Sequence, residues 1–290
     1  MQTTYSVLCG DCSTLIPTLP DRSIRLVYTS PPYALQRKSI YPGIPAKEYP
    51  AWMAGILSLL APKLTMDASV FLNIRDHQEK GALSGYVLDT VLACRQVIPH
   101  IDTLIWFCPY KPPLGSNLRP RRAYEPIYWF SPSRKPFINL RASTAEKTWK
   151  PGRKRQPKAW LQDMKLAPRQ MRHDKPPRIT DVVTAVTGSI DAGIDHAAMQ
   201  PRAVPRYIIQ HWSEPGDVVF DPCCGSGTTL LAAQELGWSG IGIDAVPQYV
   251  ELCRQRLAAA AAEKAASPHP SRKLLLIRPN AGRIVAKMPK

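Results

Sequence analysis

Two short segments of the chain place reactive groups on a backbone that is either rigid or rich in glycine. The first, Thr29-Ser30-Pro31-Pro32-Tyr33, follows an apolar stretch at 26–28. Two consecutive prolines fix φ and prevent both a strand and a helix from continuing. The turn is therefore expected to hold the Ser30 hydroxyl, the Pro31 carbonyl and the Tyr33 ring on a stiff platform, although such a turn can also be purely structural.

These three groups fit chemistry on an exocyclic amine of a nucleobase. Such an amine is a weak nucleophile because its lone pair is delocalised into the ring. Two acceptors for its hydrogens favour the pyramidal form, and Ser30 and the Pro31 carbonyl can serve as that pair. A base must leave the duplex to be reached, and Tyr33 offers an aromatic face for it. A sulfonium methyl donor is already activated, so positioning suffices without a metal.

The second segment, 221–229, reads Asp-Pro-Cys-Cys-Gly-Ser-Gly-Thr-Thr between a predicted strand and a predicted helix. Ligands bind at this place in open α/β sheets. Leu230 occupies the position of the third glycine of a dinucleotide fingerprint, and the Gly-Lys-Ser/Thr of a phosphate loop is absent. Asp244 ends the next predicted strand, where a carboxylate can accept two hydrogen bonds from ribose hydroxyls. The segment favours a nucleoside ligand, with a tight turn followed by a helix-capping acid as the alternative.

The seven cysteines raise the possibility of other chemistry. Pro222-Cys223 could supply a thiolate that attacks a cytosine ring carbon, but that route also needs a Glu-Asn-Val segment, which the chain lacks. Cys9 and Cys12 have C-x-x-C spacing, whereas a structural zinc site needs four ligands. The sequence therefore predicts no metal site.

The alternation of apolar runs and helix-length segments predicts an α/β fold: a mostly parallel sheet with helices on both faces. The length of 290 residues suits one such domain with an insertion. Strands are expected at 5–8, 26–29, 69–74, 101–108, 127–130, 218–220 and 240–243, and helices at 49–61, 83–96, 228–236 and 248–262.

The charge is strongly positive, with 38 Lys and Arg against 22 Asp and Glu, a formal net charge of +16. Residues 134–178 hold 14 of the basic residues and three acids, a net +11. Such a segment attracts polyanions, so we expect a nucleic-acid partner, with a solvated linker as the alternative. The chain has no long apolar run and no leader-like start, which predicts a cytoplasmic protein without membrane association.

Together these residues resemble a known family, the amino-methyltransferases of DNA in the permuted order that places the catalytic turn before the cofactor loop. Its motifs are Asp/Asn/Ser-Pro-Pro-Tyr/Phe and Asp-Pro-Phe-x-Gly-Ser-Gly-Thr-Thr. The stretch 29–38 looks like restriction-modification enzymes that make N4-methylcytosine. Segments 106–109 and 124–131 look like the family's paired strands, and 196–201 resembles its His-Pro-Ala-x-Phe-Pro cofactor helix.

The resemblance implies a Rossmann-like methyltransferase fold with S-adenosyl-L-methionine as the methyl donor. It implies a catalytic half at 1–133, a target-recognition region at 134–185, a cofactor-binding half at 186–264 and a basic tail at 265–290. The implied catalytic residues are Ser30, Pro31, Pro32 and Tyr33. The implied cofactor contacts are Asp11, Asp221, Pro222, Cys223, Gly225, Gly227, Thr228, Thr229, Asp244, His196, Ala198 and Gln200. The implied DNA contacts are Arg37, Lys38, Arg153, Lys154 and Arg155.

The chain also departs from the family pattern. Cys223 and Gln200 stand where the family has Phe, which puts an aromatic contact to the cofactor in doubt. Ser30 favours cytosine as the target, because most adenine enzymes of this order carry Asp there. Two alternatives stay open: an N6-adenine methyltransferase, and a catalytically inert DNA-binding module. The expected partners are double-stranded DNA with a short recognition site and a cognate restriction endonuclease, for a protein acting as a monomer or homodimer.

Overall fold

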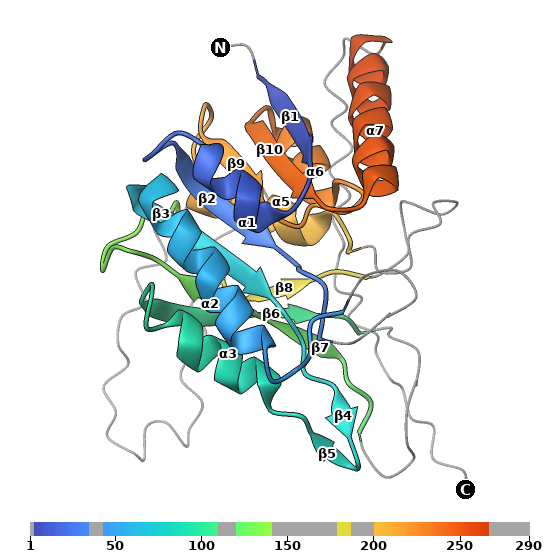
Figure 1. The fold of residues 1–290 in the computed structure, drawn as a ribbon. Coiled ribbons are helices and arrows are strands. Elements are labelled where there is room, and N and C mark those ends of the chain that lie inside the picture. The colour runs from blue at the N-terminus through green and yellow to red at the C-terminus, as the bar shows by residue number, and fades with distance from the viewer. Residues whose placement is uncertain (1–2, 35–42, 110–119, 141–178, 187–199, 267–290) are drawn as a thin grey trace, which may run out of the picture.

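A computed structural model describes residues 3–34, 43–109, 120–140, 179–186 and 200–266. Within these ranges the chain forms the predicted α/β fold, a twisted sheet between two layers of helices (Figure 1). In the described residues no helix is long and apolar enough to span a bilayer.

The main sheet has eight strands in the order β1-β10-β9-β2-β3-β7-β6-β8. Only the pairings of β7 with β3 and β6 are antiparallel; the other five are parallel. The strands are β1 (Tyr5–Cys9), β2 (Ile24–Thr29), β3 (Leu64–Asn73), β6 (His100–Phe107), β7 (Tyr124–Phe130), β8 (Val182–Thr184), β9 (Val218–Asp221) and β10 (Ser239–Asp244).

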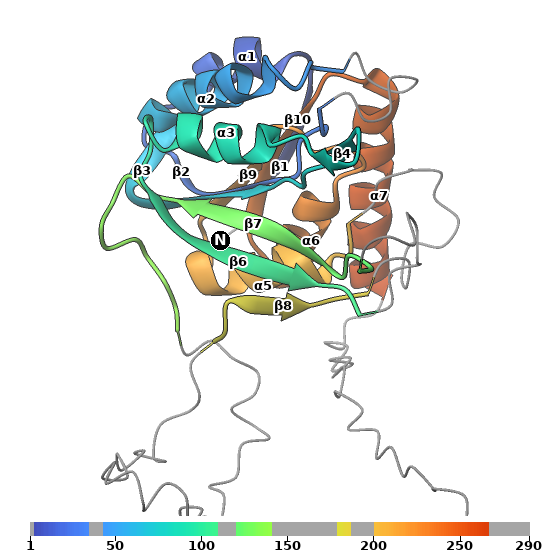
Figure 2. The same ribbon diagram turned by 90° about the horizontal axis from the view of Figure 1, so that it is seen from below.

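Helices cover both faces of this sheet, as Figure 2 shows. One face carries α1, α2 and α3, and the other carries α5 and α6, while α7 packs on α6 and β1. Their bounds are α1 (Cys12–Leu15), α2 (Tyr49–Leu60), α3 (Tyr86–Cys94), α5 (Ala203–Trp212), α6 (Thr228–Leu236) and α7 (Pro247–Ala266), with short 3-10 turns η1 (Ile16–Thr18) and η2 (Ala61–Lys63).

The central strands have buried apolar side chains on both faces because helices cover both faces of the sheet. In β2, Val27 packs into the core under α2 and α3, whereas Leu26 and Tyr28 pack into the core on the α5 and α6 face. This double burial explains why residues 26–28 of β2 are apolar in succession, without polar alternation. It also fixes the strand that carries the Ser-Pro-Pro-Tyr turn.

Five elements differ from the sequence-based expectation. Helix α5 was not predicted, because Pro205 interrupts its apolar pattern; proline is tolerated there because it lies in the first helical turn. Strands β4 (Gln78–Glu79) and β5 (Ala82–Leu83) form a hairpin too short to give a periodic signal. Strand β3 begins at Leu64, earlier than expected. Strand β8, inside the stretch expected to recognise the target, is the edge strand of the sheet, paired with β6.

Candidate active site

The Ser-Pro-Pro-Tyr turn and the glycine loop lie next to each other at the carboxyl edge of the sheet. Strand β2 ends at Thr29, directly before Ser30, and its neighbour β9 ends at Asp221. From this pair the chain proceeds to β3 on one side and to β10 on the other, so the gap between β2 and β9 is the topological switch point. Ligands of open α/β sheets bind at this position.

The Asp221 carboxylate accepts hydrogen bonds from two other residues of the glycine loop. Its Oδ1 accepts the Cys223 N–H at 3.1 Å, and its Oδ2 accepts the Thr229 hydroxyl at 2.6 Å. Pro222 and Thr228 are buried beside it. Burial raises the pKa of Asp221 to about 6 despite these hydrogen bonds. A buried carboxylate of this kind is stabilised by a cation bound next to it.

Asp244 fastens the same loop from the neighbouring strand β10. Its Oδ2 accepts the Gly225 N–H and its Oδ1 accepts the Val246 N–H, each at 2.9 Å. Each oxygen keeps a further lone pair, so the side chain can still accept hydrogen bonds from ribose hydroxyls. Burial also raises the pKa of Asp244.

Gly227 has to be glycine. It is the N-cap of α6 with φ of +83°, a conformation that side chains rarely adopt. A Cβ at this position would lie 2.3 Å from the Cys253 Sγ on α7. Helix α7 can therefore pack this closely only because residue 227 has no side chain.

The end of strand β1 completes this edge. Asp11 is the exposed N-cap of α1, and its carboxylate accepts the Ser13 N–H at 2.7 Å. The preceding Gly10 donates its N–H to the Asp244 carbonyl at 3.0 Å. Asp11 thus lies next to a residue that is hydrogen-bonded to the end of β10.

Two cysteines distant in the sequence meet beneath the loop. The Cys223 thiol donates a hydrogen bond to the Cys12 sulfur, which lowers the pKa of Cys12 and raises that of Cys223. A thiol contact therefore stands where the family pattern has an aromatic ring. Cys9 is exposed, whereas Cys12 is buried, so the C-x-x-C spacing does not bring both to one surface. Among the described residues no group of three metal-ligating side chains is present.

The Ser-Pro-Pro-Tyr turn is held by a residue that its own sequence pattern does not indicate. Pro31 is buried, and Ser30, Pro32 and Tyr33 are partly buried. The Tyr33 hydroxyl donates to Glu125 Oε2 on β7 at 2.9 Å. Glu125 was missed although it is the only charged residue of its strand, a signal that could have marked it.

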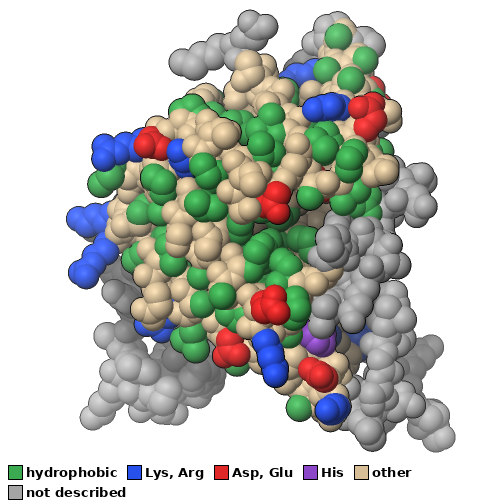
Figure 3. Space-filling model, viewed as in Figure 1, with side chains coloured by type: hydrophobic (Ala, Val, Ile, Leu, Met, Phe, Trp, Pro, Cys, Tyr) green, Lys and Arg blue, Asp and Glu red, His purple; other side chains and the backbone are tan. Residues whose placement is uncertain are grey.

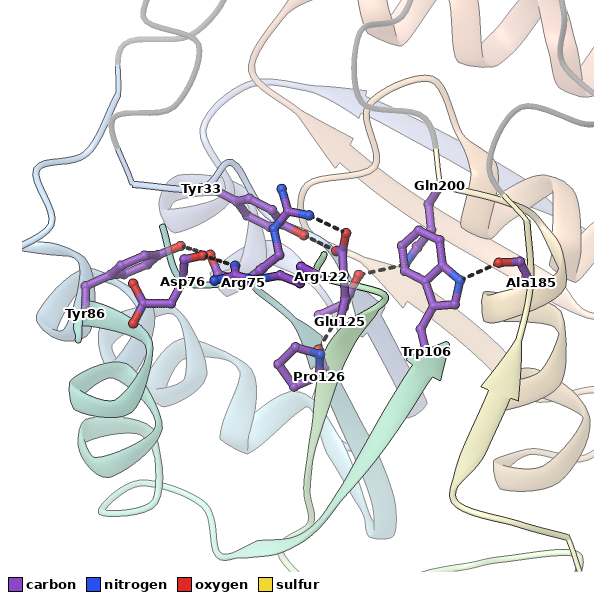
Figure 4. A network of polar contacts seen from close by, with 11 residues as sticks. Tyr33, Arg75, Asp76, Tyr86, Trp106, Arg122, Glu125, Pro126, Ala185 and Gln200 are labelled. Atoms are coloured by element: carbon purple, nitrogen blue, oxygen red, sulfur yellow. Dashed lines mark hydrogen bonds and ion pairs between the residues drawn. The ribbon is translucent and has the colours of Figure 1, made fainter. Parts of the chain in front are cut away.

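Gln200 points toward the same edge. Its Nε2 donates to the Asn73 Oδ1 at 2.7 Å, and Asn73 in turn donates to the Pro126 carbonyl at 2.8 Å (Figure 4). The side chain is therefore tied to the end of β3. The other expected contacts, His196, Ala198, Arg37, Lys38, Arg153, Lys154 and Arg155, lie outside the described residues.

The face drawn in Figure 3 carries mainly apolar side chains, with acidic and basic ones interspersed, notably around the β4–β5 hairpin. Most of the basic stretch at 134–178 lies outside the described residues. The side chains that this view colours therefore do not account for the excess positive charge of the chain.

The proteins and the family model that are similar to this chain are DNA methyltransferases. A family model described as DNA methylase, covering N6 and N4 enzymes, matches residues 24–255. The type II methyltransferase M.PvuII of Proteus hauseri is 27% identical over 277 residues, 84% of this chain and 81% of that protein. M.XycI of Xanthomonas campestris pv. cyanopsidis is 25% identical, with 86% of both chains covered.

Solved structures share the fold. The cytosine-N4-specific PvuII DNA methyltransferase superposes with a TM-score of 0.68 at 22% identity, covering 91% of this chain and 93% of that one. A DNA modification methylase of Thermus thermophilus, crystallised with S-adenosyl-L-methionine, superposes with a TM-score of 0.58 at 22% identity, with coverages of 89% and 94%. The mostly parallel sheet with helices on both faces is therefore confirmed as a methyltransferase fold.

Proposed function

The chain belongs to the N6/N4 family of DNA methylases, and from that premise we propose that it methylates the exocyclic N4 amine of cytosine in double-stranded DNA. The observation that carries this proposal is the placement of the Ser30 turn and the Asp221 loop on neighbouring strands at one switch point. A target amine bound at the Ser30 turn would then lie next to a methyl donor bound at the Asp221 loop.

S-adenosyl-L-methionine is the methyl donor of this reaction, and its sulfonium supplies an activated methyl group. The residues fit such a ligand. Asp221 offers a buried carboxylate to a cation, and Asp244 offers acceptors to ribose hydroxyls. The positive φ of Gly225 and Gly227 lets the backbone approach closely. Asp11, Pro222, Cys223, Thr228, Thr229, His196, Ala198 and Gln200 complete the proposed contacts.

Ser30 and the Pro31 carbonyl would accept the two hydrogens of the target amine. This pairing directs the nitrogen lone pair away from the base plane, toward the methyl group. Pro32 keeps the turn rigid, and Tyr33 offers a face to the extruded base. No metal or covalent intermediate enters these steps.

Cytosine is favoured over adenine by two observations. Ser30 stands where most adenine enzymes of this motif order carry Asp. M.PvuII, whose structure is named cytosine-N4-specific, is similar to this chain over most of both lengths. An N6-adenine enzyme is the second candidate, since the family includes both activities.

Binding of S-adenosyl-L-methionine should weaken at acid pH. Its ammonium and sulfonium favour an ionised Asp221, which is protonated in most molecules below pH about 6. The dissociation constant should rise about tenfold per pH unit below that value. Isothermal titration at pH 5 and 7.5 checks this, with Asp221→Asn as the variant that flattens the dependence. Equal affinity of the unmodified chain at both pH values would remove Asp221 from the cation site.

The region 134–185 is proposed to recognise the DNA target, with Arg153, Lys154 and Arg155 contacting the double strand and Arg37 and Lys38 adding contacts after the catalytic turn. Since the similar relatives are named type II methyltransferases, we also propose a short specific site and a cognate restriction endonuclease.

DNA affinity should fall steeply with salt, because phosphate contacts release counterions. Six contacts predict a loss of about 1,000-fold between about 50 and 200 mM salt. Replacing Arg153, Lys154 and Arg155 by alanine should make the slope of log affinity against log salt shallower by about 3. Arg22→Ala, an exposed residue just before the amino end of β2, is the control and should leave the slope unchanged. A loss below about tenfold in the unmodified chain would contradict a phosphate-dominated interface.

The proposed reaction is tested by transfer of a tritiated methyl group from S-adenosyl-L-methionine to unmethylated plasmid DNA. We expect acid-stable label on double-stranded DNA and none on RNA or protein. An inert DNA-binding module would bind DNA without transferring label. Titration with the methyl donor separates the two cases further, because an inert module need not retain that affinity.

A further inference from the structure

The Tyr33 ring is held in place through its hydroxyl. The hydroxyl donates to Glu125 Oε2 at 2.9 Å, and Glu125 is only 6% exposed. Burial raises the pKa of Tyr33, and the neighbouring Glu125 carboxylate raises it further. The tyrosine therefore keeps its proton and acts as the donor, and the ring is fixed at both its Cβ and its hydroxyl end (Figure 4).

Glu125 is itself held from the other side. Its Oε1 pairs with Arg75 Nη1 at 3.1 Å, so that each carboxylate oxygen has a different partner. A carboxylate so deeply buried is costly unless it is paired, and removing one partner of such a pair is strongly destabilising. The Arg75 guanidinium thus holds the Glu125 side chain in its orientation toward Tyr33.

Arg75 is anchored in turn at the end of β3. Its carbonyl accepts the Tyr86 hydroxyl of α3 at 2.9 Å. The adjacent Asp76 accepts the Ser84 hydroxyl and, at 3.0 Å, the Gly85 N–H. The link that begins at the Tyr33 hydroxyl therefore ends at Tyr86, in the first turn of α3 (Figure 4).

We propose that Glu125, held by Arg75, is a positioning residue that fixes the orientation of the Tyr33 ring for the extruded target base. The inference rests on the proposed function and deepens it. Tyr33 lies three residues after Ser30 on a rigid turn, so the orientation of its ring determines where a stacked base places its amine. Small misplacement of reacting groups costs rate more than affinity.

A double-mutant cycle on Tyr33 and Glu125 tests the inference. Tyr33→Phe keeps the ring and removes the tether; Glu125→Ala removes the acceptor. Each should lower kcat for methylation of plasmid DNA about tenfold, with KM for DNA and the dissociation constant of S-adenosyl-L-methionine nearly unchanged. Because both changes break the same hydrogen bond, the double variant should be no slower than the slower single variant.

Two further variants separate positioning from a general loss of structure. Glu125→Gln keeps an oxygen acceptor for the Tyr33 hydroxyl and should recover most of the kcat that Glu125→Ala loses. Glu79→Gln, the same change on the exposed hairpin strand β4, should be silent. Thermal unfolding of each variant identifies any that do not fold. If Glu125→Ala does not fold, the kcat values of Tyr33→Phe and Glu125→Gln still show whether Glu125 positions the Tyr33 ring.

Three outcomes would overturn the inference. Wild-type kcat in Tyr33→Phe would show that the tether is unused. A full further loss on adding Glu125→Ala to Tyr33→Phe would show that Glu125 acts independently of the ring. Loss in Glu125→Gln equal to that in Glu125→Ala would assign the effect to charge instead of orientation. Absence of methylation by the unmodified chain is a separate result, because it refutes the proposed function itself.

Discussion

Replacing Ser30 by alanine should lower kcat for DNA methylation about 100- to 1,000-fold, the usual cost of removing one preorganised hydrogen-bond partner of the reacting group. The reason is that Ser30 is proposed to accept one of the two amine hydrogens, leaving only the Pro31 carbonyl to direct the lone pair. The affinity for S-adenosyl-L-methionine should stay the same, because the residues proposed to hold that ligand, Asp221 and Asp244, lie on β9 and β10.

Single-turnover kinetics on plasmid DNA, with titration of the methyl donor, measures both quantities. Ser58→Ala is the matched control: Ser58 lies exposed on α2, and its hydroxyl donates to the Ala54 carbonyl at 2.9 Å. That variant should retain wild-type kinetics. A Ser30→Ala enzyme within about twofold of wild type would exclude Ser30 from the reaction.

Replacing Gly227 by alanine should destabilise the fold by about 2–5 kcal/mol, because two costs add. The residue has φ of +83°, which strains any L side chain. The new Cβ would also lie 2.3 Å from the Cys253 Sγ and 3.2 Å from its Cβ. Chemical denaturation gives the free energy of unfolding. Loss of the methyl-donor site should accompany the change, since Gly227 caps α6 at the end of the cofactor loop.

Gly237 provides a matched control at the other end of the same helix. It has φ of +86°, but a Cβ there would meet no atom within 4 Å. Gly237→Ala should therefore cost only the backbone strain, about 1–2 kcal/mol. Adding Cys253→Ala to Gly227→Ala should recover part of the difference. Equal destabilisation by the two glycine substitutions would show that the contact with α7 is not tight.

Local patterns predicted the elements that carry the site. The glycine loop indicated the start of α6, which runs over the predicted residues 228–236, and the Pro-Pro turn marked the end of β2. Both depend on neighbouring residues alone, through proline and glycine backbone preferences. The order of the two motifs along the chain then indicated the family that the comparisons confirmed.

Local sequence patterns could not predict the contacts between segments that are distant in the sequence. Glu125 meets Tyr33 across 92 residues, and Cys12 meets Cys223 across 211, only because of the strand order. Asp244 was expected as a ligand acceptor; the structure adds that one of its oxygens accepts the Gly225 N–H of the glycine loop and the other accepts the Val246 N–H. These pairings follow from the strand order, which local sequence patterns constrain only loosely.

Mass spectrometry of nucleosides tests the proposed methylation of cytosine most directly. Plasmid DNA is incubated with S-adenosyl-L-methionine and either the unmodified protein or the Ser30→Ala variant as the control. We expect N4-methylcytosine in the first sample and almost none in the control. N6-methyladenine would keep the family reaction and contradict the assignment of cytosine from Ser30. No methylated base in either sample would contradict the proposal that this turn and this loop form an active site.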